Sequence, residues 1–118
     1  MIHIIDDDKE IRDSFMLLLQ SAGFKSNTYD SAEKFLEYYE HNQNNDLIIL
    51  DINLTGMSGR DLMENLSNRN LYLPVIIITA FDERETRKAA KKYGALAYLR
   101  KPIDSEALID LVKFTVAN

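Results

Sequence analysis

The chain has no cysteine, no long apolar run, no excess of basic residues and no low-complexity tract. The absence of cysteine excludes a disulfide framework, a thiolate nucleophile and a cysteine metal site. No apolar run approaches membrane-spanning length, and the chain opens on the strand-like Ile2–Ile5 rather than on a basic signal segment. A net charge of −5 argues against a surface that binds nucleic acid or an anionic membrane. We therefore expect one cytoplasmic domain over residues 1–118, with no second domain attached.

Strand-like and helix-like segments alternate five times along the 118 residues, separated by short loops. This alternation is typical of a parallel sheet with helices on both faces and right-handed crossovers. Apolar runs and turn residues predict strands at 2–5, 24–29, 47–50, 75–79 and 95–99. Helical spacing and capping residues predict helices at 8–22, 30–39, 60–66, 82–93 and 104–116, with capping boxes at the start of the second and the fourth.

The most informative stretch is Asp46–Asn53, in which four aliphatic residues lead directly into Asp51. A run this short and this apolar is typical of a strand buried on both faces at the centre of a parallel sheet. The ligand crevice of an open α/β sheet lies at the carboxyl ends of its strands, so Asp51 stands where chemistry is expected. A helix cap or solvated strand end would explain Asp51 alone, but not its partners.

Polar residues also follow the other apolar strands: Asp6 and Asp7 after the first, Thr79 after the fourth and Lys101 after the fifth. Three crowded carboxylates repel one another unless a divalent cation lies among them. Oxygen ligands without histidine or cysteine favour Mg²⁺, or Mn²⁺, over zinc. A hydroxyl and an ammonium can bind the other oxygens of a transferring phosphoryl group. Because an aspartate can carry a phosphoryl group covalently, the site predicts phosphoryl transfer onto Asp51.

In this order and separation, four segments resemble the receiver domains of two-component response regulators: Ile4–Asp8, Ile48–Leu54, Ile76–Ala80 and Ala97–Ile103. The resemblance covers essentially the whole chain. It implies a flavodoxin-like (βα)5 doubly wound sheet with strand order 2-1-3-4-5 and the site at the switch point. It also implies a switch phosphorylated by a sensor histidine kinase or phosphotransfer protein. That switch would control a partner or an output domain, in transcription regulation if the natural chain is longer.

The resemblance assigns the metal site and the phosphoacceptor by position. Asp51 is the expected phosphoacceptor, and Asp6 and Asp7 match the acidic pair that holds Mg²⁺, with Asp7 favoured as the direct ligand. Asn53 would offer its backbone carbonyl to the ion. A third acid, Asp8, leaves open which two of the three aspartates face the ion, because it can also cap the following helix.

The remaining roles also follow from the resemblance. Thr79 matches the switch hydroxyl, Lys101 the phosphate-binding lysine and Tyr98 the switch aromatic, although an aromatic in a strand is usually part of the core. Pro102 stands where the family commonly has a cis peptide bond. The family usually has proline where Thr55 stands, so we expect a more mobile loop here.

The two histidines are not expected to carry a phosphoryl group. His3 lies within a strand without an acidic neighbour, and His41 lies in a polar loop.

The predicted helix 82–93 buries little more than two alanines and a tyrosine among many charged residues. An element with little buried surface can move at low cost. We hypothesise that phosphorylation draws Thr79 towards the phosphate, makes room for Tyr98 and shifts this helix between two arrangements.

In the last helix, Phe114 lies roughly 140° from the apolar stripe. It is either incidental or marks a partner surface, such as a homodimer through helices 82–93 and 104–116 and the fifth strand.

Two other functions share features with this sequence. Asp51–Thr55 approaches the signature of haloacid-dehalogenase-type phosphatases, but those enzymes normally have a second aspartate where this chain has Asn53, which cannot transfer a proton. The chain also lacks room for their substrate cap. A degenerate receiver that binds partners without phosphorylation is disfavoured because all the site residues are present. We therefore expect a regulatory domain rather than an enzyme.

Overall fold

The computed structural model describes residues 1–39 and 47–116 and confirms the predicted α/β architecture. Five parallel strands form one sheet in the order β2-β1-β3-β4-β5. The strands are β1 (Ile2–Ile5), β2 (Ser26–Tyr29), β3 (Leu47–Asp51), β4 (Val75–Thr79) and β5 (Ala97–Arg100). The helices are α1 (Lys9–Ser21), α2 (Ala32–Tyr38), α3 (Gly59–Asn68), α4 (Arg84–Lys92) and α5 (Ser105–Val116).

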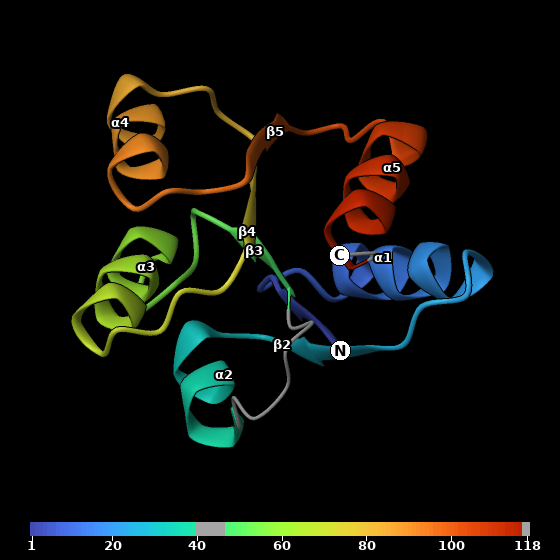
Figure 1. Ribbon diagram of the computed structural model, residues 1–118, viewed down its shortest axis with the longest axis horizontal. Helices are drawn as coiled ribbons and strands as arrows, with labels where there is room; N and C mark the ends of the chain where they lie inside the picture. Colours follow the sequence, from blue (N-terminus) through green and yellow to red (C-terminus); the bar gives the residue numbers. More distant parts are fainter. Residues whose placement is uncertain (40–46, 117–118) are drawn as a thin grey trace.

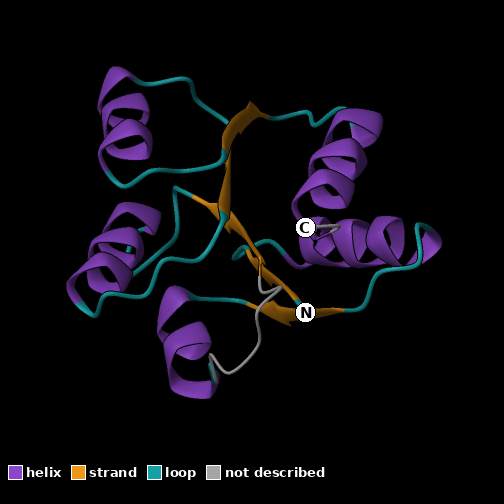
Figure 2. Cartoon of the chain, viewed as in Figure 1, coloured by secondary structure: helices purple, strands orange, loops and turns teal. Residues whose placement is uncertain are grey.

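Helices cover both faces of the sheet. Helices α1 and α5 lie on one side, and α2, α3 and α4 lie on the other (Figure 1). Figure 2 shows the same two helical layers flanking the strands. Most element boundaries differ from the predicted ones by only one or two residues. The expectations for His41 and Asp46 lie outside the described residues.

Strand β3 is buried along its whole length, as its apolar run predicts. Its side chains alternate between the two faces: Leu47 and Ile49 pack with α1 and α5, whereas Ile48 and Leu50 pack with α2 and α3. The register pairs Ile5 of β1 with Leu50, so the residues that follow these two strands lie side by side at the switch point.

Helix capping differs from the sequence prediction at two helices. The boxes expected at the starts of α2 and α4 do not form: Ser31 caps α2 without a reciprocal glutamate, and Glu83 at the N-cap of α4 makes no side-chain cap bond. A complete capping box instead joins Ser58 and Asp61 at the start of α3. Helix α1 begins as expected, with the Asp8 carboxylate accepting from the first-turn amides.

The loop from β3 to α3, residues 52–58, is held by close contacts at its middle and at its end. A Cβ added to Gly59 would lie 2.7 Å from Cα of Ile52, so only glycine allows this close approach. Gly56 has φ +77 and faces the Glu33 carboxylate of α2, which accepts a hydrogen bond from the Met57 amide at 3.2 Å. The loop therefore has anchors at its middle and its end, and the greater mobility expected from Thr55 stays a prediction.

Candidate functional site

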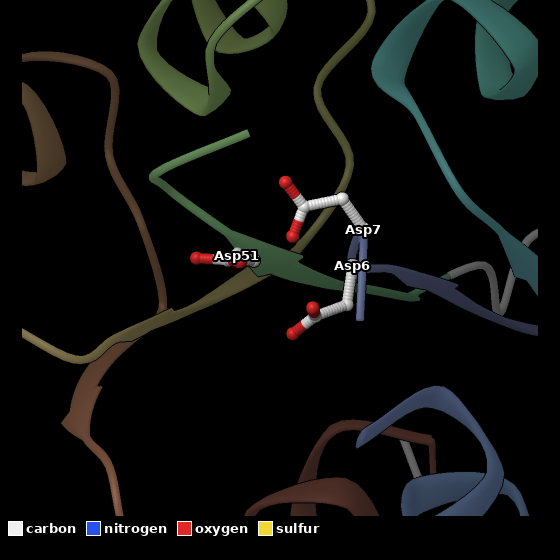
Figure 3. Close-up of side chains that lie close together, drawn as sticks. All are labelled: Asp6, Asp7 and Asp51. Atoms are coloured by element: carbon white, nitrogen blue, oxygen red, sulfur yellow. The ribbon is translucent and has the colours of Figure 1, made fainter. Parts of the chain in front are cut away.

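Three aspartates meet where β1 and β3 end (Figure 3). One carboxylate oxygen from each of Asp6, Asp7 and Asp51 lies within 4.8 Å of the other two. Asp6 and Asp51 are buried, whereas Asp7 is exposed. Asp8 instead caps α1, because its carboxylate accepts a hydrogen bond from the amide of Glu10 at 2.9 Å. The structure thus separates the three acids after β1 into two that face Asp51 and one that caps α1.

Lys101 provides a positive charge beside these carboxylates. Its ammonium lies 3.2 Å from Oδ2 of Asp6 and 3.6 Å from Oδ2 of Asp51. The Lys101 amide donates to the Thr79 carbonyl at 2.7 Å, which fixes the end of β5 against β4. The peptide bond between Lys101 and Pro102 is cis. One ammonium among three carboxylates leaves the cluster negative, and this excess charge together with the all-oxygen donors suits a divalent cation.

Burial raises the pKa of the Asp6 carboxyl above its ordinary value of 3.8. A hydrogen bond from the Asp8 amide opposes the rise, the charge of Asp51 adds to it, and Lys101 opposes it again. A carboxyl whose pKa is higher in the folded chain favours folding while it is protonated. That contribution is present below pH 3.8 and is lost as the pH rises through the folded pKa. At neutral pH without a cation, the ionised Asp6 therefore costs stability.

Asp6→Asn is expected to stabilise the ion-free chain at pH 7 by about 1 kcal/mol, because it removes a buried, crowded charge at nearly constant volume. Urea unfolding in the presence of a chelator measures this change. Adding Mg²⁺ should then stabilise the wild type more than the variant, since the variant has one carboxylate fewer in the acidic cluster. Asp110→Asn, at an exposed position of α5, is the matched control and should change neither result. An Asp6→Asn chain less stable than the wild type would contradict this reasoning.

The Thr79 hydroxyl lies at the end of β4 and is fully buried. It donates to the Phe81 carbonyl at 2.8 Å and accepts from the Phe81 amide at 3.2 Å. It also accepts from the side-chain amide of Asn53 at 3.3 Å, and the Asn53 backbone amide donates to Oδ1 of Asp51 at 3.1 Å. The Thr79 hydroxyl must therefore break its hydrogen bond to the Phe81 carbonyl before it can donate to a group on Asp51.

Comparison with known proteins decides the family. Residues 2–113 match the family model of the response regulator receiver domain. The chain belongs to this family.

Among the curated relatives of this receiver domain, the transcriptional regulatory protein FixJ of Azorhizobium caulinodans is 33% identical over 117 residues, which cover 99% of this chain and 55% of FixJ. The transcriptional regulatory protein TdiR of Thauera aromatica is 31% identical over 116 residues, covering 98% of this chain and 51% of TdiR. The receiver domain thus spans about half the length of these two relatives. A solved CheY-like receiver domain from Methanospirillum hungatei JF-1 superposes with a TM-score of 0.88 at 28% identity, covering 98% of this chain and 92% of that one.

Tyr98 of the receiver domain lies on β5 and is partly buried. Its hydroxyl donates to the Asp82 carboxylate at 3.2 Å, and Arg87 of α4 pairs with the same carboxylate at 3.3 Å. Burial raises the pKa of the Tyr98 hydroxyl, and the hydrogen bond and charge of Asp82 raise it further. The sequence pattern predicts a helix cap at Asp82, but its carboxylate instead contacts Tyr98 of β5 and Arg87 of α4, two elements of the expected switch.

The other sequence-based expectations have structural outcomes of different kinds. Helix α4 buries only Thr86, Ala89 and Ala90, in keeping with its predicted small apolar face. His3 lies within β1, the strand predicted for it, where it is buried and its Nδ1 lies 3.1 Å from the Tyr29 hydroxyl. Phe114 is 68% exposed, which leaves its role as a partner contact a prediction.

Two contacts at the receiver site could not be predicted from the sequence. The side chain of Asn53 reaches Thr79, whereas the sequence suggested a role only for its backbone carbonyl. The Thr55 hydroxyl donates to Oδ2 of Asp7 at 2.9 Å. One feature of the sequence pointed to the contact between Thr55 and Asp7. Threonine stands where the family usually has proline, and it introduces a hydroxyl beside the acidic cluster.

No helix in residues 1–39 or 47–116 is both long and apolar enough to cross a membrane.

Proposed function

We propose that residues 1–118 form a receiver domain in which Asp51 accepts a phosphoryl group in a Mg²⁺-dependent reaction and thereby switches the domain between two states. The arrangement that carries this proposal is the contact of the Lys101 ammonium with the carboxylates of Asp6 and Asp51, within the cluster that also includes Asp7. Such a site combines a nucleophile, a cation and a place for a metal ion.

The donor set fits Mg²⁺. Asp6, Asp7 and Asp51, with the backbone carbonyl of Asn53, would hold the ion, which supplies charge neutralisation for a transferring phosphoryl group. Mn²⁺ would suit the same oxygen ligands.

The chemical step uses the side chains already in place. A carboxylate oxygen of Asp51 attacks the phosphorus, and the bond from phosphorus to the donor's histidine nitrogen breaks with its electron pair staying on nitrogen. The product is an acyl phosphate on Asp51. Lys101 binds a phosphoryl oxygen, because its ammonium already lies 3.6 Å from Asp51. Thr79 releases the Phe81 carbonyl and donates to another phosphoryl oxygen.

Movement of Thr79 would transmit the conformational change from the buried site to the surface. The Thr79 hydroxyl is bonded to Phe81, and Asp82 follows directly and is bonded to Tyr98. Displacing this segment therefore changes the contact that joins β5 to α4, whose buried face is small. The phosphate favours one of two arrangements through its contacts with Thr79 and Lys101.

The partners follow from the same proposal. A sensor histidine kinase or phosphotransfer protein in the cytoplasm would donate the phosphoryl group. The output would be transcription regulation through a further domain or a partner protein, in line with the names of the relatives FixJ and TdiR. The receiver itself would catalyse at most its own phosphorylation and dephosphorylation. A homodimer through α4, β5 and α5 would place Phe114 at the contact.

The proposal predicts that the wild-type chain gains the mass of one phosphoryl group on incubation with acetyl phosphate and Mg²⁺, and none when the ion is chelated. Intact mass spectrometry measures both results. A gain of equal extent without a divalent ion would contradict the metal site. No gain under any condition, including incubation with a phosphorylated histidine kinase, would favour the degenerate receiver, which no feature of the described residues supports at present.

A further inference from the structure

We propose that Thr55 is a positioning residue for Asp7, holding this carboxylate in the orientation that a divalent cation requires. The inference rests on the proposed function insofar as Asp7 is taken as a metal ligand. Its starting point is the 2.9 Å hydrogen bond that the Thr55 hydroxyl donates to Oδ2 of Asp7. This bond joins the loop after β3 to the loop after β1 across the mouth of the site.

Asp7 needs such support more than the other two acids do. Asp6 and Asp51 are buried, and Lys101 lies against both of them. Asp7 is exposed. An exposed side chain samples several rotamers, and fixing one of them when the ion binds costs conformational entropy. The bond to Thr55 fixes Asp7 beforehand by holding one of its two carboxylate oxygens, Oδ2.

Thr55 can do this because its own loop is anchored. The next residue, Gly56, has φ +77 and lies against Glu33, and the Met57 amide donates to the Glu33 carboxylate at 3.2 Å. The Thr55 hydroxyl therefore extends from a backbone that α2 holds in place. Proline, which the family usually has at this position, carries no hydroxyl, so this chain replaces a rigid ring with a polar contact to a metal ligand.

Partners of metal-bound carboxylates typically contribute tenfold or more to affinity. Because this contact is at the surface, we expect Thr55→Val to weaken Mg²⁺ binding by about tenfold, the low end of that range. Thr55→Ala removes the same hydroxyl without adding an apolar surface and should give the same loss. Thr55→Ser keeps a hydroxyl and should bind within about twofold of the wild type. Thr28→Val, at an exposed position of β2, is the matched control and should leave affinity unchanged.

Isothermal titration calorimetry with Mg²⁺, and electron paramagnetic resonance of free Mn²⁺, measure these affinities without any phosphoryl chemistry. Amide hydrogen exchange over residues 53–58 adds a readout of the loop: Mg²⁺ should slow exchange in the wild type and in Thr55→Ser, and much less in Thr55→Val. Wild-type affinity in Thr55→Val and Thr55→Ala would overturn the inference, as would a serine variant as weak as the valine one.

Asp7→Asn separates this inference from the proposed function. If Asp7→Asn weakens binding strongly while Thr55→Val does not, the metal site stands and only the role of Thr55 is wrong. If the wild type binds no divalent ion, or Asp7→Asn binds it as well as the wild type does, the assignment of Asp7 as a ligand fails, and the inference fails with it.

Discussion

Phosphoryl uptake is expected to be lost when Asp51 is replaced by asparagine. The amide is almost the same size as the carboxylate, so the buried end of β3 should keep its packing. The amide nitrogen and oxygen are poor nucleophiles, however, and cannot form the acyl phosphate. Intact mass after incubation with acetyl phosphate and Mg²⁺ should show no gain at any time at which the wild type is fully modified.

Asp110→Asn controls for the general effect of removing one carboxylate, because Asp110 is exposed on α5, away from the site. This variant should take up the phosphoryl group at the wild-type rate. Uptake by Asp51→Asn at a comparable rate would mean that the acceptor is another residue, and the proposed roles of Asp6, Asp7 and Lys101 would then need reassignment.

Lys101→Met should slow phosphoryl uptake by about a hundredfold, the effect of removing one preorganised charge from developing negative charge. Methionine retains an unbranched apolar stem, so packing beside Pro102 is largely kept. The variant also leaves the buried carboxylates of Asp6 and Asp51 without their nearest cation. Asp6 should then hold its proton to a higher pH than in the wild type, because Lys101 lowers its pKa in the folded chain.

The time course of the mass gain measures this rate. Lys113→Met, at an exposed position on α5, removes a charge of the same sign and should react like the wild type. If Lys101→Met reacted within about threefold of the wild type, its ammonium would contribute little to the transition state, and its contacts with the two carboxylates would be structural.

The sheet and the central cluster could be predicted because two strong signals agree. The apolar runs of β3 and β4 are too short for helices and too apolar for exposed strands, so they had to lie at the centre of the sheet. Parallel strands bring their carboxyl ends to one edge. This rule places Asp6 and Asp51 at the same edge, and the strand order implied by the family resemblance, in which β1 pairs with β3, places them side by side.

The side-chain contacts could not be predicted in the same way. A carboxylate near the start of a helix can accept from its own helix or from a neighbouring segment, and a cap bond, worth only about 1 kcal/mol, does not decide between them. Glu33 accepts from Met57, and Asp82 accepts from Tyr98, where the sequence pattern suggested capping in both cases. The contact of Thr55 with Asp7 depends in addition on how closely two loops approach, which no local pattern encodes.

Chemical location of the phosphoryl group tests the central claim most directly. Borohydride reduces an aspartyl phosphate to homoserine, so the wild-type chain can be phosphorylated, reduced, digested and sequenced by tandem mass spectrometry. The proposed site predicts homoserine at position 51 alone, dependent on Mg²⁺ during phosphorylation. Homoserine at Asp6 or Asp7 in place of Asp51, or a phosphoryl group on His3 or His41 that borohydride leaves intact, would contradict it.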